Sequence, residues 1–145
     1  MNHYIVFDFG GTSVKYACSD ENGSLSKVGS FPTPADGIEA MICEMRQVFE
    51  SFGGSQGVNG IAVSSPGAVD SEKGCVGGIS AIPYIHEIPL RDMISEELGG
   101  LPVSIENDAN CAALGELWQG AARGKKNMVS VVCGTGIGGA VVVGG

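Results

Sequence analysis

The sequence predicts an α/β fold: a mixed β-sheet that opens with a three-stranded antiparallel meander and carries helices on its faces. Three observations predict it. The chain begins with three short apolar segments joined by turn sequences, and helical and strand-like patterns alternate after them. Glycine accounts for 24 of the 145 residues, more than twice its usual share of ~7%. Its clusters follow strand-like runs, where tight turns and close approach of a ligand to the backbone require it.

The opening meander follows from the turn residues between its strands. A first strand is expected over residues 4–9 and a second over residues 14–18, after a turn with two glycines. Asn22-Gly23 is a strong hairpin signal, so the third strand is expected over residues 25–31. A proline then ends the meander.

The rest of the chain alternates between the helical and strand periods. Apolar residues at helical spacing predict a helix over roughly residues 36–52, ended by two glycines. Leu117 and Trp118 are expected to pack the third helix against the sheet. In chain order, the other expected elements are a strand over 61–63, an irregular segment with a short hairpin over 68–89, a helix over 90–98, a strand over 103–105, a helix over about 107–119 and strands over 128–132 and 137–143.

Composition excludes several classes of function. Lys plus Arg is 8 and Asp plus Glu is 16, which gives a formal net charge of −8. Nucleic-acid and anionic-membrane binding draw on Lys and Arg facing phosphates, so neither partner is expected. The five cysteines are widely spaced without Cys-x-x-Cys, so no zinc site is expected within this chain. The N-terminus has no secretion signal and no apolar run approaches ~18 residues, so a cytoplasmic location is expected.

The first candidate site is the glycine turn after the first strand. The backbone N–H groups of Gly10 and Gly11 can lie against a phosphate because no Cβ intervenes, and the Thr12 hydroxyl adds a donor. Asp8 precedes the turn, where a Mg²⁺ on that phosphate would sit, directly or through water, and Lys15 follows it. The alternative is a plain β-turn in which glycine supplies a positive φ.

The second candidate site is the glycine-rich segment over residues 134–139. It matches Gly-x-Gly-x-x-Gly, the dinucleotide fingerprint, but that fingerprint must open a helix. Here a β run of alanine and valines follows. A second strand–turn–strand phosphate clamp made by Gly134, Thr135 and Gly136 is therefore the better interpretation.

The third candidate site is the polar segment over residues 106–110. It lies between a strand and a helix, at the edge where α/β proteins place ligands. The structural alternative is a helix N-cap, because Asn and Asp are preferred there. One residue is enough for a cap, whereas four polar residues crowd this segment, which favours a functional role for Asn107 and Asp108.

Four segments together resemble the motifs of one known family. They are residues 8–15 (DFGGTSVK), 64–70 (SSPGAVD), 106–116 (ENDANCAALGE) and 133–139 (CGTGIGG). In order and spacing they resemble the ROK family of bacterial sugar kinases and related repressors. The resemblance covers the whole chain and implies a ribonuclease H-like, actin-like ATPase domain.

The resemblance implies phosphoryl transfer from ATP to a sugar hydroxyl, commonly the 6-hydroxyl. Asp108 would be the general base, Asn107 would hydrogen-bond the sugar, and Gly67 would let the ring approach. Asp8 would orient Mg²⁺. The phosphates would be held by Gly10, Gly11, Thr12 and Lys15 on one side and by Gly134, Thr135 and Gly136 on the other. The loop over residues 77–84 would help to select the sugar, whose identity the sequence leaves open.

The resemblance also implies a larger protein. Family members run to about twice this length, with a C-terminal lobe that carries a cysteine-rich structural zinc motif and the adenosine pocket. Residues 1–126 are expected to form the N-terminal sugar-binding lobe, and residues 127–145 the first hairpin of the second lobe. A homo-oligomer is expected, and this chain alone is expected to be inactive and to pair with a second copy through that apolar hairpin.

Two other functions stay open at this point. One is a non-catalytic ROK-type sugar-sensing regulator or ATP-binding module. An intact Asp108 counts against it because a pure sensor has no need of a base. The family's repressors also carry a helix-turn-helix ahead of the first phosphate motif, for which the residues before Asp8 leave no room. The other is a purely structural role for the glycine turns and the Asn107-Asp108 pair.

Overall fold

The computed structural model describes residues 2–134 and 136–145. Its backbone contacts divide the chain into two compact units, residues 1–106 and 107–145. The lobe boundary expected between residues 126 and 127 stays a prediction.

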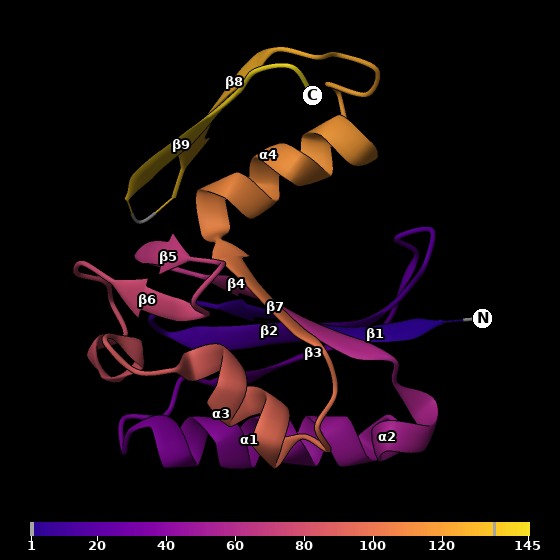
Figure 1. Cartoon of the computed structure of the whole chain (residues 1–145), viewed down its shortest axis with the longest axis vertical. Coiled ribbons are helices and arrows are strands. Elements are labelled where there is room, and N and C mark those ends of the chain that lie inside the picture. The colour runs from indigo at the N-terminus through magenta and orange to yellow at the C-terminus, as the bar shows by residue number, and fades with distance from the viewer. Residues whose placement is uncertain (1, 135) are drawn as a thin grey trace. The chain divides into compact units, whose positions relative to one another are not determined.

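The first unit is built on a five-stranded sheet in the order β3-β2-β1-β4-β7 (Figure 1). β1 pairs antiparallel with β2, β2 pairs antiparallel with β3, and β1 pairs parallel with β4. The sheet is therefore mixed and begins with an antiparallel meander, which confirms the predicted fold class. The strands are β1 (His3–Phe9), β2 (Ser13–Asp20), β3 (Leu25–Pro32), β4 (Gly60–Ser65) and β7 (Val103–Asn107).

Alternation along β1 separates the core from the site. Ile5, Phe7 and Phe9 are buried, and Phe7 is only 2% exposed. Asp8 stands between the two phenylalanines and is exposed. Because successive side chains of a strand point to opposite faces, burying Phe7 and Phe9 presents the Asp8 carboxylate on the other face.

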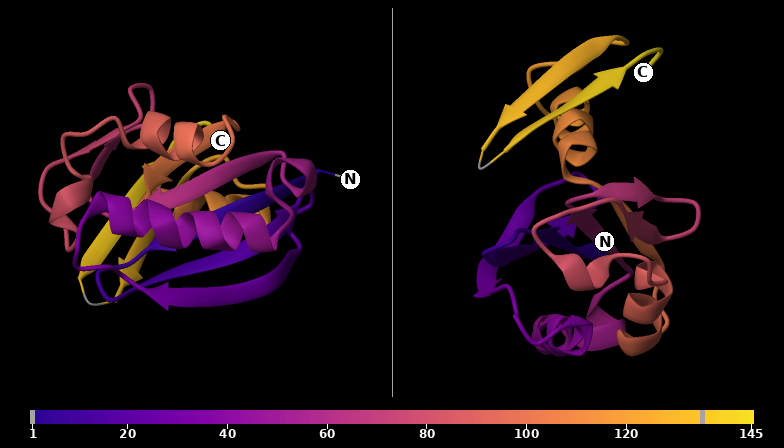
Figure 2. Two further views of the ribbon diagram at one scale, coloured as in Figure 1. Left: turned by 90° about the horizontal axis from the view of Figure 1, so that it is seen from below. Right: turned by 90° about the vertical axis from the view of Figure 1, so that its left-hand side faces the viewer.

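Three helices lie on the same side of this sheet (Figure 1). They are α1 (Ile38–Ser51), the short α2 (Gly54–Gly57) and α3 (Leu90–Glu97). In the right-hand view of Figure 2, α1 is seen nearly end-on beside α3. Each long helix buries one apolar stripe, and the predicted spacing of that stripe in α1 is confirmed. The fully buried helical side chains are Met41, Met45, Leu90 and Ile94.

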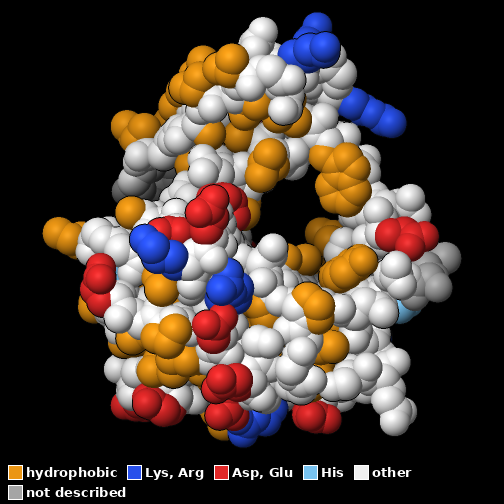
Figure 3. Space-filling view, in the orientation of Figure 1, with side chains coloured by type: hydrophobic (Ala, Val, Ile, Leu, Met, Phe, Trp, Pro, Cys, Tyr) orange, Lys and Arg blue, Asp and Glu red, His pale blue; other side chains and the backbone are white. Residues whose placement is uncertain are grey.

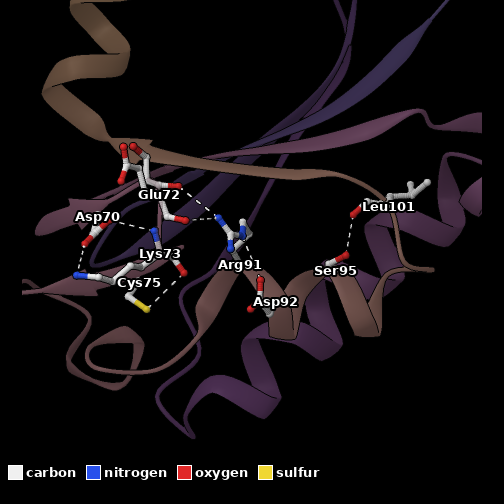
Figure 4. Close-up of polar contacts among 9 residues, drawn as sticks. Asp70, Glu72, Lys73, Cys75, Arg91, Asp92, Ser95 and Leu101 are labelled. Carbon is white, nitrogen blue, oxygen red and sulfur yellow. Dashed lines mark hydrogen bonds and ion pairs between the residues drawn. The ribbon is translucent and has the colours of Figure 1, made fainter.

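The segment between β4 and α3 forms the predicted short hairpin. Its strands are β5 (Ala68–Asp70) and β6 (Cys75–Gly77), and a 3-10 turn, η1 (Pro83–Ile85), follows. Figure 4 shows Arg91 of α3 reaching the turn of the hairpin, where its Nη1 donates to the backbone oxygens of Glu72 at 2.9 Å and Ser71 at 3.4 Å. The Lys73 N–H donates to the Asp70 carboxylate and, with the Lys73 ammonium, holds the pKa of Asp70 below its usual value.

Removing the Arg91 side chain is expected to loosen this hairpin. Arg91→Ala should lower the free energy of unfolding by about 1–2 kcal/mol, because the backbone oxygens of the hairpin turn lose a charged donor. Urea denaturation measures this change. Arg46→Ala is the matched control, since Arg46 forms an exposed ion pair with Glu97, and such pairs contribute about 0–1 kcal/mol. Equal losses in the two variants would contradict an anchoring role for Arg91.

The second unit packs one helix against a hairpin. Helix α4 (Asp108–Trp118) contacts β8 (Met128–Cys133) and β9 (Ile137–Val142), which pair antiparallel. α4 buries Ala109 and Ala113, and Leu117 one turn later is half-buried. The predicted packing of Trp118 is wrong: it is 55% exposed. At 100° per residue, Trp118 falls off the stripe that Ala109, Ala113 and Leu117 define.

The hairpin of the second unit carries exposed valines. Val129, Val131 and Val141 are each about two-thirds exposed or more. They alternate with half-buried residues along both strands, so one face of the hairpin is apolar and open. Association of two copies through this face stays a prediction.

Acidic side chains outnumber basic ones in the sequence, and many of them lie on the surface. Figure 3 shows acidic side chains gathered along the edge over α1 and α3, with Lys and Arg among them. Within the described residues, no helix is both long and apolar enough to cross a membrane. The same part of the chain holds no group of three or more His, Cys, Asp or Glu side chains arranged for a metal ion.

Candidate functional site

The turn between β1 and β2 offers backbone donors to solvent. The Gly10 N–H donates to the Ser13 oxygen at 3.1 Å and closes the turn. Gly11 and Thr12 are exposed, and among the described residues their N–H groups have no backbone partner. Two adjacent N–H groups at the tip of a turn are the donors that a phosphate binds.

The two glycines of this turn are required because a Cβ atom would not fit, and not because of their backbone conformation. Neither Gly10 nor Gly11 has a positive φ, so the alternative based on positive φ is wrong. A Cβ atom at Gly10 would lie 2.7 Å from the Ser13 oxygen, and one at Gly11 would lie 2.6 Å from the Cβ of Ala81. Any larger residue would push the turn away from Ser13 or from the loop that carries Ala81.

Asp8 lies on the exposed face of the sheet with two polar neighbours. It is opposite Lys15 in β2 and opposite Ser64 in β4. The Ser64 hydroxyl donates to Asp8 Oδ1 at 2.8 Å and so orients the carboxylate. A single exposed carboxylate beside a turn that could bind phosphate suits Mg²⁺, which takes one or two carboxylates plus phosphate oxygens and waters. The sequence analysis missed Ser64 as a partner of Asp8, since the parallel β1–β4 register brings them together across 56 positions.

Thr33 fixes the turn from the end of β3. Its hydroxyl donates to the Gly10 oxygen at 2.5 Å, and its N–H donates to the Thr12 oxygen at 3.0 Å. Thr33 therefore occupies the carbonyl oxygens of Gly10 and Thr12 and holds the turn from both sides of Gly11. Sequence reasoning did not find Thr33, because it follows the third strand rather than the turn.

Gly67 begins the β5–β6 hairpin in a conformation that only glycine adopts easily. Its φ is +103°. A Cβ atom there would lie 2.8 Å from Val76 Cγ1, 3.2 Å from the Gly77 oxygen and 3.4 Å from His86 Cε1. Glycine is thus required at the residue expected to let a sugar approach, for two reasons. Its φ is positive, and neighbouring atoms occupy the space that a Cβ would need.

Asn107 is the N-cap of α4. Its Oδ1 accepts from the N–H groups of Ala109 at 3.0 Å and Asn110 at 3.2 Å. The structural alternative for this residue is confirmed, because the oxygen satisfies two unpaired N–H groups of the first turn. Both lone pairs of that oxygen are used by the cap, and the role of Asn107 in sugar binding stays a prediction.

Asp108 is the first residue of α4 and is exposed. Its Oδ1 accepts from the Ala109 N–H at 2.9 Å. Oδ2 accepts no hydrogen bond from the part of the chain that the structure describes. The cap belongs to Asn107, which leaves Asp108 with a carboxylate oxygen that is available to accept a proton.

The described residues of the β8–β9 turn include Gly134 and Gly136. A Cβ at either glycine would meet no atom of the described residues within 4 Å, and the Gly134 N–H donates to the Gly136 oxygen at 2.8 Å. Thr135, predicted as a phosphate contact, lies outside the described residues. The run after the turn is strand β9, so the dinucleotide-fingerprint alternative, which needs a helix there, is excluded.

The site residues fall into two groups. The β1–β2 hairpin holds Asp8, Gly10, Gly11, Thr12 and Lys15 close together in the first unit, which also contains Gly67. The second unit contains Asn107, Asp108, Gly134 and Gly136. A mixed sheet that opens with a meander, with an exposed glycine turn between the first two strands, defines an α/β domain.

Comparison with known proteins identifies the family. The sequence profile of the ROK family matches residues 4–145. The chain belongs to the ROK family, and its fold is the actin-like ATPase fold. A curated glucokinase from Thermotoga maritima is 35% identical over 142 residues, which cover 97% of this chain and 44% of that protein.

Two solved structures superpose closely on the chain. A ROK family glucokinase from Streptomyces griseus, in complex with glucose and AMPPNP, is 32% identical with a TM-score of 0.84 and covers 99% of this chain. A ROK family protein from Streptococcus pneumoniae, in complex with sucrose, is 38% identical with a TM-score of 0.84 and covers 98%. The chain covers 45% and 46% of those two proteins. It therefore spans about half the length of the relatives that it matches.

Proposed function

We propose that this chain is the N-terminal part of an ATP-dependent kinase that phosphorylates a hexose or hexose derivative on a hydroxyl group, with the 6-hydroxyl as the first candidate. The observation that carries the proposal is Asp108, an exposed carboxylate with Oδ2 unengaged at the start of α4. A sugar-binding module has no need of a base at that position. The glucose and AMPPNP in the Streptomyces griseus glucokinase support a sugar and a nucleotide as the two ligands.

In this proposal Asp108 accepts the proton of the attacking sugar hydroxyl. A base lowers the activation barrier of phosphoryl transfer because it removes that proton as the oxygen attacks. Asn107 orients the sugar through its amide group while its oxygen caps the helix. Gly67 gives the sugar ring an approach to the backbone.

The phosphates bind the glycine turns in this proposal. Phosphate oxygens contact the N–H groups of Gly11 and Thr12 and the Lys15 ammonium. Gly10 closes the turn that presents these N–H groups. Asp8, oriented by Ser64, holds Mg²⁺ directly or through water. The ion supplies positive charge against the phosphate oxygens. In the second unit Gly134, Thr135 and Gly136 provide the second clamp, and a structural zinc belongs to the lobe beyond this chain.

The test is phosphorylation of a sugar panel by the full-length protein, with ATP and Mg²⁺. Glucose, N-acetylmannosamine, fructose and a β-glucoside cover the range of the family. ATP-dependent formation of a sugar phosphate supports the kinase. Sugar binding without turnover of any of them would instead support the alternative function, a non-catalytic sugar-sensing regulator or ATP-binding module.

The 145-residue chain alone is expected to show no sustained sugar kinase activity. It carries the proposed base and the first phosphate turn, but its relatives are about twice as long, and the adenosine pocket is proposed to lie in their other half. A coupled assay on the purified chain measures this, with Asp108→Asn prepared in the same way to reveal contaminating kinase. Turnover by the wild-type chain that Asp108→Asn abolishes would contradict a site divided between two halves.

A further inference from the structure

The loop over residues 77–84 joins the β5–β6 hairpin to α3 and has an unsupported tip. Gly78 has a φ of +77°, and Ile79 at the tip is 97% exposed. A loop with so little burial at its tip has a defined shape only if hydrogen bonds fix the residues beside the tip. Those hydrogen bonds come from Ser80 and His86.

Ser80 and His86 close the loop. The Ser80 Oγ lies 2.7 Å from His86 Nε2 and accepts from the Ile82 N–H at 3.2 Å. The Ser80 hydroxyl therefore bonds Ile82, which precedes η1, and His86, which follows it. The buried Nδ1 of His86 has no hydrogen-bond partner among the described residues, so the contact with Ser80 is the polar contact that sets the orientation of the ring.

The His86 ring lies beside Gly67. A Cβ at Gly67 would be 3.4 Å from His86 Cε1. His86 also bridges to Val76, and the next N–H, of Glu87, donates to the Val76 oxygen at 2.9 Å. The imidazole thus lies between the loop and the Gly67 turn.

The same loop contacts the phosphate turn. The Cβ of Ala81 lies 2.6 Å from the position that a Cβ at Gly11 would occupy. The Tyr84 hydroxyl donates to the Pro34 oxygen at 2.7 Å, and burial raises the pKa of that hydroxyl. The loop therefore spans the distance between the phosphate turn and the Gly67 turn within one unit.

We propose that Ser80 and His86 are positioning residues for sugar recognition. They hold the loop over residues 77–84 and the Gly67 backbone in the shape that the sugar meets, without touching the sugar themselves. This inference rests on the proposed sugar kinase function and adds two specificity-determining residues to it.

The test is Ser80→Ala in the full-length protein. The loss of the Ser80–His86 contact should raise KM for the preferred sugar roughly tenfold, the scale of one lost hydrogen bond. kcat and KM for ATP should stay within about twofold, because the base and the phosphate turn keep their own hydrogen bonds. Steady-state kinetics with each substrate varied in turn measure all three constants.

Two variants separate positioning from general stability. In the wild-type protein the Ser95 hydroxyl donates to the oxygen of Leu101, which follows α3, at 2.8 Å (Figure 4). Ser95→Ala removes this hydroxyl and should leave KM for the sugar unchanged. His86→Gln keeps an amide near the place of Nε2 and should retain most of the affinity, whereas His86→Ala should match Ser80→Ala. The double variant Ser80→Ala/His86→Ala should raise KM by less than the two single changes combined, since both single changes remove the same Ser80–His86 contact.

Each outcome has one meaning. A raised sugar KM in Ser80→Ala with the Ser95→Ala value unchanged supports the inference. An unchanged sugar KM in Ser80→Ala, or additive effects in the double variant, overturns it and leaves the kinase function intact. Absence of turnover in the wild-type protein with every sugar overturns the proposed function and this inference with it.

Discussion

Replacement of Asp108 by Asn is expected to lower kcat for sugar phosphorylation at least ~100-fold, the usual size of a general-base contribution. Asn has nearly the same size and still accepts from the Ala109 N–H, but it cannot take up a proton. KM for the sugar should change little. Because Asn107 caps the helix, the melting temperature should fall by no more than about 3 °C, which corresponds to one lost charge at a helix N-terminus.

The matched control is Asp92→Asn. Asp92 is an exposed carboxylate in the first turn of α3, where it pairs with Arg91, so the substitution removes the same charge from the first turn of another helix. Its kcat should equal that of the wild-type protein. A near-wild-type kcat for Asp108→Asn would remove Asp108 from the base role and reduce its contribution to helix stability alone.

Replacement of Gly67 by Ala is expected to lower the free energy of unfolding by about 2–6 kcal/mol. The φ of +103° costs an L-residue about 1–3 kcal/mol. The added Cβ would also lie 2.8 Å from Val76 Cγ1 and 3.2 Å from the Gly77 oxygen, and such overpacking costs about 1–3 kcal/mol. Chemical denaturation of this chain measures the change without any assay of function.

Gly100→Ala separates backbone strain from crowding. Gly100 has a φ of +70°, and a Cβ there would meet nothing within 4 Å. This control should lose about 1–2 kcal/mol, the cost of a left-handed L-residue. If Gly67→Ala were no more destabilising than Gly100→Ala, the contacts with Val76 and Gly77 would contribute nothing to the requirement for glycine.

Local signals predicted most of the fold. The Asn22-Gly23 hairpin is confirmed, with Gly23 at a φ of +80°. The N–H groups of Ser24 and Asn22 donate to Asp20 and hold the pKa of that carboxyl below its usual value. The helix α2 over Gly54–Gly57 was not predicted, because glycine has little intrinsic preference for a helix and only packing favours one there.

The residues of the candidate site could be predicted from the sequence, but the contacts that orient them could not. Glycine turns and a crowded polar segment can be identified in a sequence, whereas the contacts that orient them join distant positions. The register between β1 and β4 brings Ser64 to Asp8, and Thr33 reaches Gly10 across 23 positions. Only the folded hairpin places His86 beside Gly67.

The alternation along β1 limits which changes of length this domain accepts. Phe7 and Phe9 lie in the core, and Asp8 between them faces the other side. One residue inserted before Phe7 would exchange the two faces from that point on, moving the carboxylate into the apolar interior and a phenyl ring into water. Insertions are therefore expected to survive in the β5–β6 turn around Lys73 and to be eliminated from β1. A library of single-residue insertions scored for folded protein would show a gap over residues 4–9.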